Sequence, residues 1–105
     1  MADYLLVLVT APSKIEAEKI SKAILSKKVC ACVNMISGIK SLFHWEGKIN
    51  NAKETLLVIK TKKSAYKDLE KIIKKNHSYT VPEIIAIPIV FGSSEYLNWI
   101  KETVK

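Results

Sequence analysis

The chain has 105 residues, 49% of them hydrophobic and 26% charged, values typical of one folded domain, so residues 1–105 are treated as a single domain. The net charge is +7, yet all 17 basic residues are lysines and none is an arginine. Because arginine is the residue that grips phosphates and guanine through two parallel hydrogen bonds, this composition disfavours a nucleic-acid-binding protein and predicts a solvated lysine coat.

The sequence predicts neither a membrane partner nor secretion. Its longest apolar run, Ile84–Phe91, is interrupted by Pro88 and falls far short of the about 20 residues that a helical span needs. Asp3 stands where a signal peptide carries basic residues. We therefore expect a cytoplasmic protein in which Cys30 and Cys32 stay reduced.

The first elements are a buried strand and an amphipathic helix. Tyr4–Thr10 is a continuous run of residues that favour strands, and it ends before Pro12. Ser13 is followed three residues later by Glu16, the spacing of a capping box, and an apolar stripe then continues for about four turns to Lys27–Lys28.

The next segment predicts a long β-hairpin. Apolar and polar residues alternate from Ala31 to Trp45, with a bulge expected at Ser37–Gly38. Glu46–Gly47 is typical of a tight turn, and Glu54–Lys62 is the expected returning strand.

The rest of the chain repeats the strand–helix–strand order. A second helix is predicted from Ser64, a loop over 77–83, a last strand at Glu83–Phe91 and a short final helix opened by Ser93–Ser94. Right-handed crossovers then give an α+β fold, a βαββαβ sandwich whose four-stranded antiparallel sheet carries both helices on one face. Pro88 places the last strand at an edge of the sheet.

The hairpin is too long for a monomer of this design. Fifteen residues from Ala31 to Trp45 extend about 50 Å at the usual rise, and a helix of about 14 residues covers only about 21 Å of that length. The uncovered tip carries Phe43 and Trp45, so we expect further copies of the chain to cover it in a closed oligomer.

Several blocks resemble the divalent-cation tolerance (CutA) family in order and spacing: VTAPS (9–13), ACVN (31–34), WEGKI (45–49), ETLLVIKTK (54–62), HSYTVPEIIAIPI (77–89) and YLNWI (96–100). The resemblance implies a ferredoxin-like subunit with an extended hairpin and a C-terminal helix, assembled as a homotrimer similar in outline to the PII signalling proteins. It also implies a link to copper and other divalent cations. Ser78 stands where the family usually has proline, which predicts a less rigid loop, and no family role is transferred to His44.

Four side chains are candidate metal ligands, though no cofactor is required by the sequence. Cys30 and Cys32 are expected on the same strand face and suit soft metals such as Cu(I) or zinc, while burial in the core is the alternative. His77 and His44 are the only histidines. We take Cys32 and His77 as the candidate ligands for Cu(II) or another divalent cation and predict weak binding that depends on His77.

A second group of residues predicts either a small polar pocket or the anchors of the trimer interface. Its members combine aromatic, lysine and carboxylate side chains near one expected subunit boundary: Trp45, Lys48, Lys60, Tyr79 and Glu83. Both interpretations stay open from the sequence.

Other functions of this topology are disfavoured. The sequence lacks a glycine-rich phosphate loop and a nucleophile–base pair, so we expect no enzyme. Leu56–Ile59 offers no aromatic on which RNA bases could stack, and residues 10–13 lack the C-x-x-C motif of metal-transfer domains. The remaining alternative to cation tolerance is a PII-like small-molecule sensor or a protein-interaction scaffold.

Overall fold

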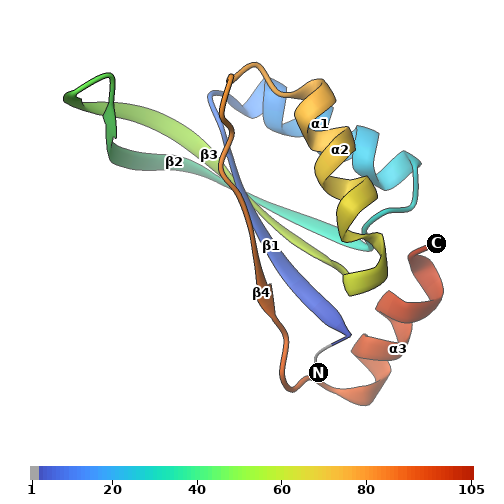
Figure 1. Cartoon of the computed structure of the whole chain (residues 1–105). Coiled ribbons are helices and arrows are strands. Elements are labelled where there is room, and N and C mark those ends of the chain that lie inside the picture. Colours follow the sequence, from blue (N-terminus) through green and yellow to red (C-terminus); the bar gives the residue numbers. More distant parts are fainter. Residues whose placement is uncertain (1–2) are drawn as a thin grey trace.

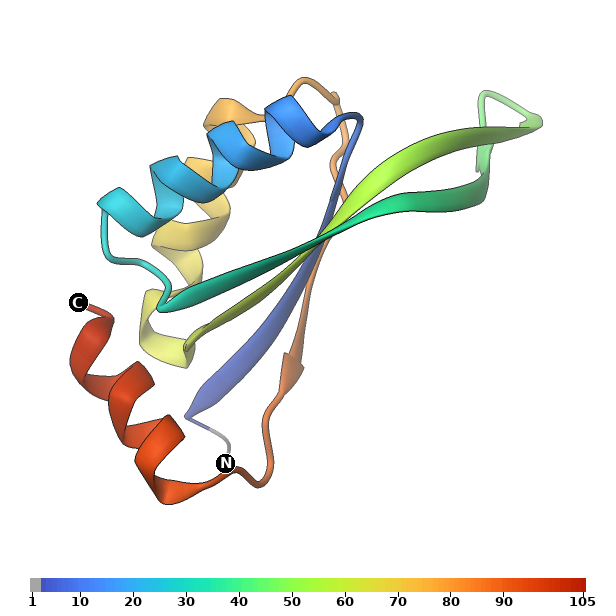
Figure 2. The same ribbon diagram turned by 180° about the vertical axis from the view of Figure 1, so that it is seen from behind.

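In the computed structural model, which describes residues 3–105, the chain folds into one antiparallel sheet with helices packed against it. The elements are β1 (Tyr4–Ala11), α1 (Lys14–Ser26), β2 (Cys32–Trp45), β3 (Lys48–Lys62), a 3-10 turn (Lys63–Ala65), α2 (Tyr66–Asn76), β4 (Ile84–Pro88) and α3 (Ser94–Thr103). The strand order is β2-β3-β1-β4. Figures 1 and 2 show α1 and α2 side by side on one face of the sheet. The predicted α+β sandwich is confirmed.

The position of β4 confirms the prediction drawn from Pro88. β4 pairs with β1 alone, and Pro88 lies opposite Leu5 at the end of that pairing. The strand ends there instead of continuing to Phe91 as predicted, although the Ile89 amide still donates to the Tyr4 carbonyl oxygen at 2.9 Å.

The core lies between the sheet and helices α1 and α2. Alternate residues of β1 and β3, such as Val7, Val9, Leu57 and Ile59, are fully buried against the apolar stripes of the two helices. Helix α3 packs separately: Ile100 is buried with Val104, Ala31 and Ala65 in a smaller cluster. Within residues 3–105 no helix has the length and apolar character that crossing a membrane requires.

The opposite face of the sheet carries no helix. The register places Val58 between Leu8 and Asn34, and Ile85 on the far side of Leu8, so their side chains share this open face. Ile85 and Ile87 are about half exposed there.

The β2–β3 hairpin projects beyond the rest of the molecule, as Figures 1 and 2 show. It turns at Glu46 and Gly47, both at positive φ, and the predicted bulge lies between Ile36 and Ile39 with Gly38 at positive φ. Beyond the bulge the hairpin exposes large apolar side chains: Leu42, Phe43, Trp45 and Ile49. The longest dimension of the subunit is 44 Å, which reflects this projection.

Two further predicted boundaries were wrong. The returning strand begins at Lys48 and not at Glu54, because the tight turn lets pairing start at once with Trp45 opposite Lys48. The second helix begins at Tyr66 after a 3-10 turn and not at Ser64, and no side chain caps it.

Candidate functional site

A cleft of about 840 Å³ opens where the hairpin leaves the body of the subunit. Its walls come from three parts of the chain: the end of β1, both strands of the hairpin, and the segment between α2 and β4. The lining residues are Thr10, Ser41, Leu42, Phe43, His44, Trp45, Asn50, Asn51, Glu54, Ser78, Tyr79, Thr80, Val81, Pro82 and Glu83. A cleft of this size fits a small organic ligand.

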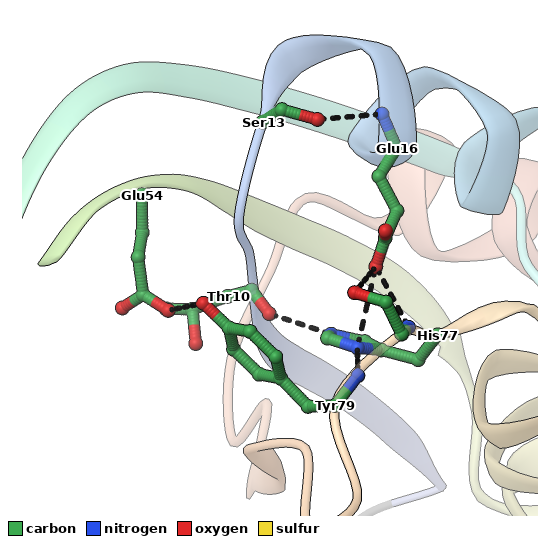
Figure 3. Close-up of polar contacts among 7 residues, drawn as sticks. Thr10, Ser13, Glu16, Glu54, His77 and Tyr79 are labelled. Atoms are coloured by element: carbon green, nitrogen blue, oxygen red, sulfur yellow. Dashed lines mark hydrogen bonds and ion pairs between the residues drawn. The ribbon is translucent and has the colours of Figure 1, made fainter.

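One wall of the cleft is fixed by a hydrogen bond between Tyr79 and Glu54. The Tyr79 hydroxyl donates to Glu54 Oε2 at 2.8 Å, which ties the loop before β4 to the middle of β3 (Figure 3). Burial, together with the hydrogen bond to the Glu54 carboxylate and that group's charge, raises the pKa of Tyr79 to about 12. Tyr79 therefore stays a neutral donor across the physiological range.

His77 holds the same loop from the other side and is wholly buried. Its Nε2 lies 2.8 Å from the Thr10 carbonyl oxygen, and its Nδ1 lies 3.1 Å from the Tyr79 amide nitrogen (Figure 3). Because the carbonyl only accepts and the amide only donates, the proton sits on Nε2 and Nδ1 accepts. Both ring nitrogens are thus occupied, and this geometry speaks against the prediction of His77 as a metal ligand.

Glu16 completes the anchoring of this loop. The Ser13 hydroxyl accepts from the Glu16 amide at 3.1 Å, which is one half of the predicted capping box. The Glu16 carboxylate, however, turns to Ser78, accepting from its amide at 2.9 Å and from its hydroxyl at 3.0 Å. The serine that replaces the family's usual proline is therefore held by two hydrogen bonds, and the lower rigidity of the loop stays a prediction.

The five residues predicted as a pocket or interface group do not form one cluster. Trp45, Tyr79 and Glu83 line the cleft. Lys48 lies opposite Trp45 at the hairpin tip but outside the cleft, and Lys60 pairs with Cys32 near the other end of β3. The two lysines stand about 40 Å apart along the strand at the usual rise, so they cannot share one cluster within a subunit, while the interface alternative stays a prediction.

The two cysteines occupy different environments, and neither forms a disulfide. Cys30 precedes β2 and is buried in the core, where desolvation, and to a smaller extent the nearby Cys32, raises its pKa to about 12. Cys32 begins β2 and is half-buried, with Lys60 Nζ at 3.7 Å from its Sγ. The prediction of two thiols on one strand face was wrong, because the strand starts at the second of them. The alternative of core burial holds for Cys30 alone.

Three residues of the site were missed by sequence reasoning: Glu54, Glu16 and Thr10. Glu54 was recognised only as the start of a strand, and its polar neighbours Lys53 and Thr55 gave no signal of its burial. In residues 3–105 no group of three His, Cys, Asp or Glu side chains lies close enough together to hold a metal ion. His44 lines the cleft as an exposed side chain.

A family profile described as "CutA1 divalent ion tolerance protein" matches residues 5–103. The chain belongs to the CutA1 divalent ion tolerance family. This confirms the resemblance read from the sequence blocks.

Individual CutA proteins agree with this assignment. The divalent-cation tolerance protein CutA of Archaeoglobus fulgidus is 48% identical over 94% of this chain and 96% of its own length. The chloroplastic CutA of Arabidopsis thaliana is 42% identical over 96% of this chain, which spans only 56% of that relative. The solved structure of the divalent cation tolerance protein from Thermus thermophilus superposes with a TM-score of 0.95 at 40% identity, covering 97% of this chain and 99% of the other.

Proposed function

We propose that this CutA protein works as a homotrimer that confers tolerance to divalent cations, copper among them, by binding a metal ion or a small ligand at its subunit boundaries. The observation that carries the proposal is the projecting hairpin. It exposes 46% of Trp45 and 40% of Phe43 beside a cleft that the same residues line. A neighbouring subunit seated on the hairpin would cover these rings and stand at the mouth of the cleft.

The energetics favour such an assembly. Burying an aromatic side chain of this kind contributes roughly 1.5–3 kcal/mol, so the hairpin tip is costly to leave in water. The open face of the sheet adds Ile85 and Ile87, and β2 and β4 each present an unpaired edge. Closed cyclic assembly satisfies such edges without leaving one free for uncontrolled pairing. The number three rests on the family resemblance.

A metal site in the trimer would draw on more than one subunit. His77 is occupied by its own loop, whereas Cys32 is half-buried and its thiol contacts the Lys60 ammonium at 3.7 Å. Cys32 is therefore the protein ligand we assign to a soft cation, with further donors contributed across the boundary.

The cleft also supports the second candidate, a PII-like trimer that senses a small molecule. Its size and its mixed aromatic and polar lining are those of a ligand pocket. In either role we propose binding without catalysis or a required cofactor.

We also place the protein in the cytoplasm, where its two free thiols would stay reduced. The solved structure of the relative from Archaeoglobus fulgidus is described as periplasmic, so cell fractionation is the direct check of location.

The function is tested by growth on raised copper. A bacterial strain that lacks its own CutA gene receives this gene, the Trp45→Ala variant, or the Cys32→Ser variant. We expect the unaltered gene to restore growth and both variants to restore less. Growth that does not differ between the unaltered gene and an empty vector would contradict the proposal.

A further inference from the structure

The charge of the cleft is opposite to that of the chain. Lysines make up 17 of 105 residues, yet none of the 15 residues that line the cleft is a lysine. The only carboxylates among them are Glu54 and Glu83, and the one histidine is His44. A protein of net charge +7 thus keeps one acidic hollow on its surface.

The most informative residue of this hollow is Glu54, because it is almost wholly buried. Only 7% of the residue is exposed, and its Oε2 accepts from the Tyr79 hydroxyl (Figure 3). Its second carboxylate oxygen has no hydrogen-bond donor in the part of the chain that the structure describes, and it reaches solvent, because no buried side-chain oxygen there is left without a partner. Buried carboxylates are normally paired with a cation, and this carboxylate lines the cleft with one oxygen free to accept from a ligand.

The aromatic side chains that line the cleft determine which kind of cation it can bind. Phe43, Trp45 and Tyr79 supply aromatic rings, whose faces attract ammonium groups and whose area covers a hydrocarbon stem. A volume of about 840 Å³ suits an organic molecule better than a bare metal ion, and residues 3–105 hold no three-ligand cluster for a metal.

We propose that the cleft binds a small organic ammonium ion. Glu54 and Glu83 hold the nitrogen, and the aromatic walls hold the carbon chain. The inference rests on the proposed function, because it names the ligand class for the same site. It also narrows the ligands that such a sensor would detect. Nucleotides and other phosphates need lysine or arginine around them, and the lining that one subunit supplies includes neither.

The test uses the assembled full chain and 1,4-diaminobutane as the probe. Trp45 reports binding by fluorescence in a Trp99→Phe background, because Trp99 lies on α3, outside the cleft. We expect saturable quenching by the diamine and none by 1,4-butanediol, its neutral isostere, or by ATP. Glu54→Gln and Glu83→Gln should each weaken binding by about tenfold or more, the usual effect of losing a hydrogen bond to a charged group. Glu102→Gln, an exposed carboxylate change on α3, should leave it unchanged.

Several results would overturn the inference. These are equal binding of the diol, tighter binding of ATP, a response to Zn²⁺ alone, or an unchanged affinity in both cleft variants. Glu83 is exposed, so its variant stays informative even where Glu54→Gln disturbs folding. A protein that forms trimers and restores growth on copper but ignores the diamine would refute this inference and leave the proposed function standing.

Discussion

At the scale of single residues, the loop before β4 owes its shape to His77. The imidazole joins the Thr10 carbonyl to the Tyr79 amide and has no exposed surface. We expect His77→Ala to lower the free energy of unfolding by about 2–3 kcal/mol, because it leaves two backbone groups unsatisfied in the interior. Urea unfolding at one fixed protein concentration measures this change. His44→Ala, at an exposed position, is the control and should change stability by less than about 0.5 kcal/mol.

Tyr79 predicts an alkaline limit to stability. Its pKa is about 12 in the fold, above the ordinary value of 10.0, so folding favours the neutral phenol. That contribution is complete below pH 10 and is lost as the pH rises from 10 toward 12. We expect Tyr79→Phe to unfold with a shallower loss of stability over this range. Cys30, Tyr66 and Tyr96 also have raised pKa values, so the difference between the two proteins is the quantity to measure. Identical slopes would show that Tyr79 does not titrate with unfolding.

The two thiols should differ sharply in reactivity. Burial raises the pKa of Cys30 to about 12, which leaves almost no thiolate at neutral pH, whereas Cys32 is half-buried. With an aromatic disulfide reagent we expect one thiol per chain to react in the native protein and two after unfolding. The native reaction should vanish in Cys32→Ser. Rapid labelling of Cys30 in the folded protein would contradict this packing.

At the scale of elements, the hairpin depends on its turn. Glu46 and Gly47 both have positive φ, at 51° and 76°, the conformation that the twist of paired strands requires. Nothing lies within 4 Å of a Cβ added at Gly47, so Gly47→Ala carries only the backbone cost of about 1–2 kcal/mol. Thermal unfolding should show this loss, while Glu46→Gly, which relieves the same strain, should show little or none.

The elements were largely predictable, and the site was not. Local patterns sufficed for the strands: the apolar run of β1, the alternation of β2 and Pro88 at an edge each depend on neighbours in sequence. The site depends on contacts between distant segments, such as Tyr79 with Glu54 and Ser78 with Glu16. Residue types alone indicated that Trp45, Tyr79 and Glu83 belong to a candidate site. Only the pairing register could show that Lys60 and Lys48 lie at opposite ends of β3.

At the scale of the whole molecule, the proposed trimer accounts for the surfaces that the subunit leaves uncovered. The hairpin tip and the open sheet face expose large apolar side chains, and β2 and β4 are the two edge strands, which are the kinds of surface that subunit interfaces cover. Because the same hairpin lines the cleft, assembly and ligand binding are expected to be linked, and ligand that binds the trimer should stabilise it.

The measurement that tests the account most directly is the mass of the protein in solution. Sedimentation at micromolar concentration should show a single species of three times the 11.8 kDa subunit mass. Trp45→Ala should dissociate the trimer or lower its melting temperature, whereas Lys22→Ala, an exposed change on α1, should not. A stable, monodisperse species with the mass of one subunit would contradict the account.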